Sequence, residues 1–157
     1  MGGGLDIYVK KITSSAFIQS RKKLKPELFY ALHQLMVSEY YKDNDANVKL
    51  YKGMRVLSID GSTINLPITP STVAEYGIYN NQKKTDDVVI GRVSVLYDVL
   101  NEIVLDGVLR PFSEGEVALS REQFVYAQKG DLIFMDRAYT SFDSAYTLQQ
   151  MEVHFLF

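Results

Sequence analysis

Two aspartates of the chain each directly follow a candidate strand. Leu132 to Met135 is a short apolar run, and Asp136 comes next. Met54 to Ile59 is a second candidate strand, and Asp60 follows it. The patterns predict two strands that each end in an aspartate, the later one buried on both faces. Open α/β sheets carry their chemistry outside the carboxyl ends of their strands, so we expect both carboxylates there.

Two such carboxylates have the chemistry of a divalent metal site. A right-handed crossover would place the two strands side by side, about 4.8 Å apart, so that Asp60 and Asp136 could share one ion. Mg²⁺ and Mn²⁺ prefer hard oxygen ligands, with substrate phosphate completing the shell. With a second ion, one metal activates a water or 3′-hydroxyl and the other stabilises the leaving oxygen. A two-ion site needs a third acid, and the sequence presents no convincing one.

Other interpretations of these acids are weaker. The haloacid-dehalogenase phosphatases use the motif Asp-x-Asp-Gly-Thr, but Ser58 stands where the nucleophilic aspartate would be. A hydroxyl there cannot form an aspartyl-phosphate, so this function is disfavoured. Asp60 and Gly61 alone would also fit a turn after a strand. The pair Asp86 and Asp87 could bind metal, although a turn or strand-edge role is favoured.

Composition sets broad limits on the function. The 157 residues amount to about one domain, and 46 % hydrophobic with 23 % charged residues is typical of a soluble globular protein. The absence of cysteine excludes disulfides, thiolate zinc sites and a cysteine nucleophile. No apolar run approaches the ~20 residues that span a bilayer, and no signal peptide is visible. We therefore expect a cytoplasmic protein without a membrane partner.

The charge is distributed unevenly along the chain. Residues 1 to 60 hold ten Lys and Arg against six Asp and Glu, a balance of +4, and the remaining residues hold seven against thirteen, a balance of −6. These balances give the net charge of −2. The basic run of Arg21, Lys22, Lys23 and Lys25 can be interpreted as a DNA-backbone contact or as a solvated helix face, and the sequence alone favours the second.

Helical patterns dominate the N-terminal part. Ser14 or Ser15 is the expected N-cap of a helix that ends near Leu24, and Pro26 fits the first turn of a second helix. That second helix has an apolar face made of Leu28, Phe29, Leu32, Leu35, Met36 and Tyr40. Residues 1 to 50 are thus expected to form a helical N-terminal segment, with a polar linker at 42 to 49.

The rest of the chain alternates strands and helices. Residues 67 to 87 are expected to form a long polar loop. Strands at 88 to 97 and 103 to 109 form a hairpin. Ser120 is the expected N-cap of a helix ending near Gly130, and Thr140 or Ser141 caps another. Residues 153 to 157 are expected to be a final buried strand.

This order predicts the fold class. Three antiparallel strands, followed by parallel strands with helical crossovers, is the order of the ribonuclease-H-like α/β fold. We expect residues 51 to 157 to form part of such a domain, with a mixed sheet.

The chain resembles the DDE transposases of bacterial insertion sequences, in the insertion-sequence-four group, whose catalytic domain is ribonuclease-H-like. Four segments carry the resemblance in the order of the family, from about residue 13 onward: SAFIQSRKKLKPELF (15–29), IDGSTINLP (59–67), VSVLYDVLNEIVLDG (93–107) and GDLIFMDRAY (130–139).

The resemblance implies a function and roles for residues. Asp60 matches the first catalytic, metal-binding aspartate, Asp136 the second, and Arg137 the basic residue that commonly follows, with Mg²⁺ or Mn²⁺ as cofactor. Such bacterial enzymes hydrolyse one strand at a transposon end and use the freed 3′-hydroxyl to attack target DNA. They act on double-stranded DNA at the nucleoid, as synaptic homodimers when complete. The expected DNA contacts are Arg21, Lys22, Lys23, Lys25, Lys83, Lys84 and Arg137.

One feature of the family is missing. Its third acid lies in a Tyr-x-x-Arg-x-x-x-Glu-x-x-x-x-x-x-Lys signature, and no Tyr-x-x-Arg occurs in this chain. The chain therefore resembles the front part of a transposase, and these residues alone are expected to be catalytically poor. One alternative is a non-catalytic remnant of a decayed element that at most binds DNA. A stand-alone ribonuclease-H-like nuclease is a further alternative, disfavoured by the missing acid.

Overall fold

The computed structural model describes residues 12–43, 47–80 and 87–157, and the chain divides into two compact units. The N-terminal unit is Met1–Lys42 and the C-terminal unit is Asp43–Phe157. Helix α1, Ser14–Arg21, begins one residue earlier than expected, because the Thr13 hydroxyl is the N-cap that accepts from the Ala16 amide at 3.2 Å. It also ends before Leu24. Helix α2, Pro26–Asp43, starts at the expected proline.

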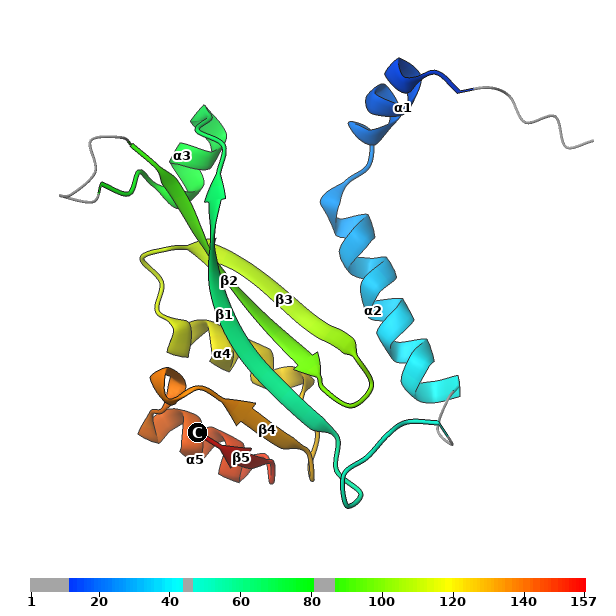
Figure 1. The fold of residues 1–157 in the computed structure, drawn as a ribbon, viewed down its shortest axis with the longest axis vertical. Coiled ribbons are helices and arrows are strands. Elements are labelled where there is room, and N and C mark those ends of the chain that lie inside the picture. The colour runs from blue at the N-terminus through cyan, green and yellow to red at the C-terminus, as the bar shows by residue number, and fades with distance from the viewer. Residues whose placement is uncertain (1–11, 44–46, 81–86) are drawn as a thin grey trace, which may run out of the picture. The chain divides into compact units, whose positions relative to one another are not determined.

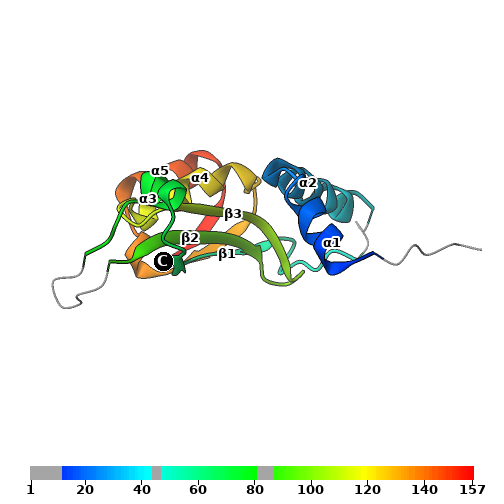
Figure 2. The same cartoon turned by 90° about the horizontal axis from the view of Figure 1, so that it is seen from above.

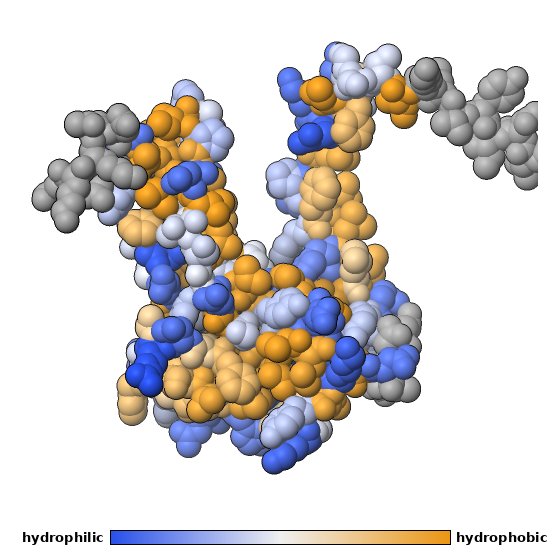
Figure 3. All heavy atoms as spheres, viewed as in Figure 1, coloured by the Kyte–Doolittle hydropathy of each residue, from blue (hydrophilic) through white to orange (hydrophobic). Residues whose placement is uncertain are grey.

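The predicted apolar face of α2 is not buried. Orange, apolar surface follows both helices in Figure 3. Exposed fractions run from 44 % at Leu28 to 71 % at Met36, and Phe29, Leu32 and Leu35 lie between these values. Helices in proteins are stabilised mainly by packing of such a face. Local rules were sufficient to predict where α2 begins. They do not predict whether its apolar face is packed against other elements.

The C-terminal unit is built on a five-stranded mixed sheet in the order β3-β2-β1-β4-β5 (Figure 1). β1 pairs antiparallel with β2, and β2 with β3, whereas β4 runs parallel to β1 and β5 parallel to β4. This confirms the expected ribonuclease-H-like arrangement. The strands are β1 Val56–Leu66, β2 Val89–Asp98, β3 Ile103–Pro111, β4 Leu132–Met135 and β5 His154–Leu156.

β1 is longer than expected, and Asp60 does not end it. Its pairing with β2 runs from Leu57 opposite Asp98 to Leu66 opposite Val89. Its parallel pairing with β4 stops much earlier, at Ile59 opposite Met135. The long hairpin with β2 keeps β1 extended beyond Asp60. Asp60 therefore lies at the point where β1 loses its neighbour on the β4 side.

The two faces of the sheet differ in burial. Leu57, Ile59 and Ile133 lie on one face and are at most 2 % exposed. The helices α3, α4 and α5 of this unit lie on one side of the sheet (Figure 2). On the other face Leu132 and Phe134 of β4 are only half-buried. The expectation that this strand is buried on both faces is wrong, because the helices of the unit cover one face.

A further helix replaces part of the expected polar loop. Helix α3, Pro70–Tyr76, is capped by Thr69. The Thr69 hydroxyl accepts from the Thr72 amide at 3.2 Å, and the Thr72 hydroxyl accepts from the Thr69 amide at 3.0 Å. A reciprocal cap of this kind, with proline in the first turn, is a strong start signal. The prediction of a loop over 67 to 87 was wrong at this helix.

Helix α4, Glu116–Gln123, starts earlier than predicted and continues as a 3₁₀ turn, η1, Phe124–Tyr126. Ser120 is not its N-cap. It lies in the middle of the helix, fully buried, and its hydroxyl donates to the Val117 carbonyl at 2.9 Å. The helix also ends well before Gly130. Its position is set instead by buried Gln123, which accepts from the Ser94 hydroxyl at 2.7 Å and so ties α4 to β2.

The last two elements follow the prediction more closely. Helix α5, Phe142–Gln150, is capped by Ser141, whose hydroxyl accepts from the Ser144 amide at 3.0 Å. β5 forms at the sheet edge, where it pairs with β4 alone, and its side chains are exposed or half-buried. It is therefore an edge strand rather than a buried one. None of the helices in the described part of the chain is long and apolar enough to cross a bilayer.

Candidate functional site

The parallel register of β1 and β4 brings the two aspartates together. Ile59 lies opposite Met135, and the next residue along each strand is Asp60 or Asp136. Neighbouring parallel strands are about 4.8 Å apart, so the two backbones place their carboxylates at adjacent positions. Both residues are exposed. The structure thus produces the juxtaposition that the sequence predicts.

Local hydrogen bonds hold each carboxylate by one oxygen. Asp60 Oδ1 accepts from the Gly61 amide at 2.8 Å. Asp136 caps the 3₁₀ turn η2, Arg137–Tyr139, and its Oδ1 accepts from the Ala138 amide at 2.9 Å. The Oδ2 atom of each has no hydrogen-bond partner among the described residues. One oxygen of each aspartate is therefore available to an external ligand.

This donor set fits a hard divalent cation in part. Carboxylate oxygens are the ligands that Mg²⁺ and Mn²⁺ prefer, and one or two of them suffice when water and phosphate fill the other positions. Within residues 12–43, 47–80 and 87–157, no three Asp, Glu, His or Cys side chains are grouped closely enough to hold a metal. Asp60 and Asp136 can thus anchor one ion, and a two-ion site would require a further acid.

Tyr139, at the end of η2, packs against β1 next to the two aspartates. It is 2 % exposed, and its hydroxyl lies so close to Gly61 that an ideal Cβ there would be 2.4 Å from Oη. Burial raises the pKa of Tyr139 to about 12, and the charges of Glu116, Asp60 and Asp136 add to this effect. The phenol is consequently neutral beside the carboxylates and available as a hydrogen-bond donor.

Glu116 is a neighbour of the site that the sequence did not reveal. It is the first residue of α4, and its carboxylate pairs with the Arg92 guanidinium from β2. Arg92 also donates to the Phe112 carbonyl at 3.4 Å and lies over the Phe112 ring, 4.7 Å from its centroid. Because Arg92 neutralises Glu116, this third carboxylate is engaged in a structural ion pair.

A substitution at Gly61 tests the packing of Tyr139 against β1. Gly61→Ala would place a methyl group 2.4 Å from Tyr139 Oη, whereas the Val93 carbonyl oxygen is 3.4 Å away. Overpacking of this kind typically costs about 1–3 kcal/mol, and we expect that loss in urea-induced unfolding. The double variant Gly61→Ala/Tyr139→Phe, which removes the clashing oxygen, should regain most of it. Equal stability of Gly61→Ala and wild type would contradict this packing.

The raised pKa of Tyr139 predicts a dependence of stability on alkaline pH. The usual tyrosine pKa is 10.0 and that of Tyr139 in the folded protein is about 12. Folding therefore favours the neutral phenol, a contribution fully present below pH 10 and lost as the pH rises towards 12. The unfolding free energy of wild type should fall relative to Tyr139→Phe across this window. The phenolate absorbance difference between the two proteins measures the pKa directly, and titration near 10 would contradict the prediction.

The predicted DNA-contacting residues fall into three groups. Arg21, Lys22, Lys23 and Lys25 are all exposed around the connection between α1 and α2. Arg137 is exposed in η2, directly after Asp136, and forms no ion pair with any described residue. Lys83 and Lys84 lie outside the described residues, as does Asp86. Of these basic residues, the structure brings Arg137 to the two aspartates.

No protein-family model and no curated protein matches the chain. Two solved structures resemble it: "Mos1 transposase paired-end complex with left transposon end", at 14 % identity and a TM-score of 0.43, and "Crystal structure of a pre-cleavage Mos1 transpososome", at 12 % and 0.39. Each match covers 79 % of this chain. This chain spans only 39 % of the length of the first matched chain and 40 % of the second. The fold assignment rests on the strand order and directions given above.

Proposed function

We propose that the chain is part of the catalytic domain of a DDE transposase and that Asp60 and Asp136 hold Mg²⁺ or Mn²⁺ in it. The observation that carries the proposal is the register of β1 and β4, which follows Ile59 and Met135 with two neighbouring aspartates. The proposed reaction is that of the transposase family, which the four sequence segments described above resemble.

The residues support metal-assisted phosphoryl chemistry. A bound divalent cation would polarise a phosphate and lower the pKa of an attacking water or hydroxyl. Asp60 and Asp136 each offer one oxygen for it, and both lie exposed, where a DNA backbone can reach them. Tyr139, buried against Gly61 of β1, keeps a neutral phenol next to them. The third acid of the family signature would have to come from a residue other than Asp60 and Asp136.

Double-stranded DNA is the proposed substrate, as transposon ends and as target. Arg137, next to Asp136 and exposed, is placed to contact a phosphate bound at the two aspartates. The complete protein is proposed to act as a homodimer in a synaptic complex.

The proposed function is tested by metal-dependent DNA cleavage. The probes are labelled duplexes that span the ends of the DNA segment encoding the protein, incubated with Mg²⁺, with Mn²⁺ or with a chelator. A nick that leaves a 3′-hydroxyl in Mg²⁺ or Mn²⁺ and disappears with chelator is the expected result for the complete protein. Absence of any metal-dependent nick would overturn the assignment.

A second candidate function is DNA binding without cleavage, as in a remnant of a decayed element. The observation that favours it is the exposed basic group of Arg21, Lys22, Lys23 and Lys25, together with the lack of a third metal-binding acid among the described residues. The logarithm of the binding constant would then fall linearly with the logarithm of the salt concentration, with a slope of about −0.9 for each phosphate contact. Salt-sensitive binding without nicking in any metal would favour this function over the first.

A further inference from the structure

The pairing between β1 and β4 ends just before the two aspartates. The last paired residues are Ile59 and Met135, so neither Asp60 nor Asp136 belongs to the paired segment of these strands. β1 is still held at this point by β2, because Asp60 lies opposite Val95. β4 itself ends at Met135, and the chain then turns into η2. The separation of the two carboxylates therefore depends on how η2 is held against β1.

Tyr139 connects η2 to β1. Its side chain is 2 % exposed, and its hydroxyl packs against Gly61, the residue that follows Asp60. An ideal Cβ on residue 61 would be 2.4 Å from Tyr139 Oη and 3.7 Å from Cζ. Glycine leaves room for this contact, because Cβ atoms essentially never come within 3.0 Å of another atom. The contact is thus one residue beyond Asp60 and three residues beyond Asp136.

Two hydrogen bonds make η2 a compact link between Tyr139 and Asp136. The Tyr139 amide donates to the Asp136 carbonyl at 2.9 Å. The Asp136 carboxylate belongs to the same turn, because its Oδ1 accepts from the Ala138 amide at 2.9 Å. A turn closed in this way leaves little freedom between its first and last residues. A displacement of the Tyr139 ring is therefore transmitted to the backbone and the carboxylate of Asp136.

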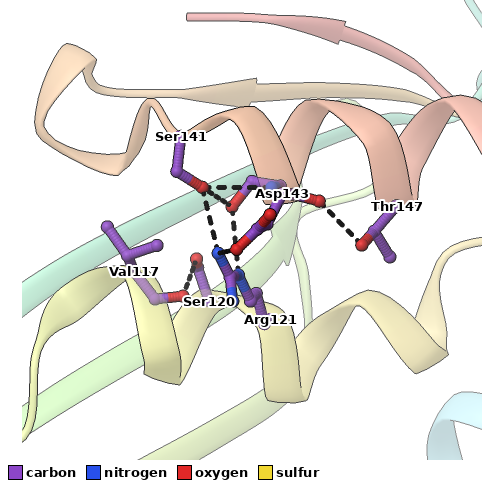
Figure 4. Close-up of polar contacts among 7 residues, drawn as sticks. Val117, Ser120, Arg121, Ser141, Asp143 and Thr147 are labelled. Atoms are coloured by element: carbon purple, nitrogen blue, oxygen red, sulfur yellow. Dashed lines mark hydrogen bonds and ion pairs between the residues drawn. The ribbon is translucent and has the colours of Figure 1, made fainter.

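The continuation of η2 is held as well. The chain passes from η2 into α5, whose first turn is joined to α4 by Arg121 (Figure 4). Arg121 Nη2 donates to the Ser141 hydroxyl at 3.2 Å and to Asp143 Oδ2 at 3.1 Å, while its Nε donates to the Ser144 hydroxyl at 3.4 Å. Because β4 holds one end of η2 and α4 the other, the turn has little freedom to move away from β1 as a body. A bad contact at Gly61 is instead relieved within η2 itself.

Tyr139 acts on the backbone of the site and not on the Asp60 carboxylate. Successive residues of a strand point to opposite faces of the sheet, so Gly61 lies on the same face as buried Ile59. That face is the one covered by the helices and by Tyr139, and the Asp60 side chain points to the other face. Tyr139 is consequently a support for the aspartates rather than a further ligand.

We propose that Tyr139 is a positioning residue, whose packing against Gly61 sets the separation of the Asp60 and Asp136 carboxylates and thereby their joint affinity for a divalent cation. This inference rests on the proposed function and adds to it the contact that prepares the metal site. Residues that orient metal ligands without touching the metal typically contribute about ten- to a hundredfold to metal affinity.

Mn²⁺ binding to the full chain tests the inference without requiring cleavage. The electron paramagnetic resonance signal of free Mn²⁺ disappears on binding and so measures the affinity. Gly61→Ala displaces the Tyr139 ring, and Tyr139→Leu is too short to maintain the contact. Each variant should bind Mn²⁺ about ten- to a hundredfold more weakly than wild type. The double variant Gly61→Ala/Tyr139→Phe should restore most of the affinity, because the new methyl group takes the place of the phenol oxygen.

A matched control separates positioning from a loss of stability. Val153→Ala removes buried apolar atoms, at 4 % exposure, at the opposite end of β4, since the next residue, His154, lies opposite Leu132. This variant should lower the free energy of unfolding and leave the Mn²⁺ affinity unchanged, with every protein measured without urea and under conditions where it is folded. An equal loss of affinity in Val153→Ala would identify a general effect of destabilisation and overturn the inference.

The remaining outcomes distinguish the inference from the proposed function. Asp60→Asn and Asp136→Asn remove the proposed ligands and should abolish Mn²⁺ binding. If they do so while Gly61→Ala and Tyr139→Leu bind as wild type does, the positioning role is overturned and the metal site stands. Failure of the double variant to regain affinity also overturns this role, because the lost contact is then not the cause. If wild type and both Asn variants bind Mn²⁺ equally, the proposed metal site itself fails. Should Gly61→Ala not fold, Tyr139→Leu decides alone.

Discussion

Replacing Asp60 or Asp136 with Asn is expected to lower the metal-dependent DNA strand cleavage proposed for the complete protein about a thousandfold or more. Each replacement removes the one carboxylate charge that its strand brings to the site. A catalytic divalent cation supplies several kcal/mol of transition-state stabilisation, and each 1.36 kcal/mol corresponds to a factor of ten in rate. Because the two aspartates occupy neighbouring positions in the register, loss of either one should have the same effect.

Single-turnover nicking of a labelled duplex in Mg²⁺ and in Mn²⁺ measures this effect. The matched control is Glu102→Gln, which removes an exposed carboxylate in the turn between β2 and β3, on the side where β1 begins rather than at Asp60. Both aspartates are exposed, so the Asn variants should unfold at the same urea concentration as wild type. Cleavage by either Asn variant within about tenfold of the control would rule out a metal-ligand role.

Loss of the buried ion pair between Arg55 and Asp131 should be the most destabilising single change. The side chains are only 10 % and 5 % exposed. Arg55 Nε donates to Asp131 Oδ1 at 2.9 Å and its Nη2 donates to Oδ2 at 2.5 Å, in a bidentate arrangement. Removing one partner of a buried pair typically costs about 3–5 kcal/mol, since the other charge stays buried without this counter-ion. We expect Asp131→Ala to lose this amount.

The position of this pair connects stability with the site. Arg55 immediately precedes β1 and Asp131 immediately precedes β4, and the Leu132 amide donates to the Arg55 carbonyl at 2.9 Å. The pair therefore fixes the point at which the two parallel strands begin to pair. The register that this start imposes is the one that ends with Asp60 beside Asp136.

Urea-induced unfolding of the chain measures the loss. Glu152→Gln is the control, because it breaks the Lys129 to Glu152 pair whose side chains are 74 % and 63 % exposed, and a surface pair is worth at most about 1 kcal/mol. The double variant Arg55→Met/Asp131→Leu should recover much of the stability, because it leaves no buried charge. An Asp131→Ala variant no less stable than Glu152→Gln would contradict the prediction.

Several elements could be predicted from patterns of only a few neighbouring residues. The apolar run 132 to 135 became β4 with those bounds, Ser141 capped α5, and Pro26 opened α2. In each case one short pattern decides the structure, because the bounds of an apolar run, capping and the fixed φ of proline depend on adjacent residues. The same local patterns failed for α4, where the Ser120 signal resembles a cap but the residue is buried inside the helix.

The sequence by itself determined the order of the strands, the ribonuclease-H-like class and the two aspartates that come directly after the paired segment of β1 and β4. Only the tertiary structure decided that β1 continues to Leu66, that Tyr139 lies beneath Gly61, and that Glu116 is engaged by Arg92. The physical reason is the range of the interactions. The length of β1 depends on its partner β2, and the neighbours of the site come from elements far apart in the chain. Such contacts leave no periodic or spacing pattern in the sequence.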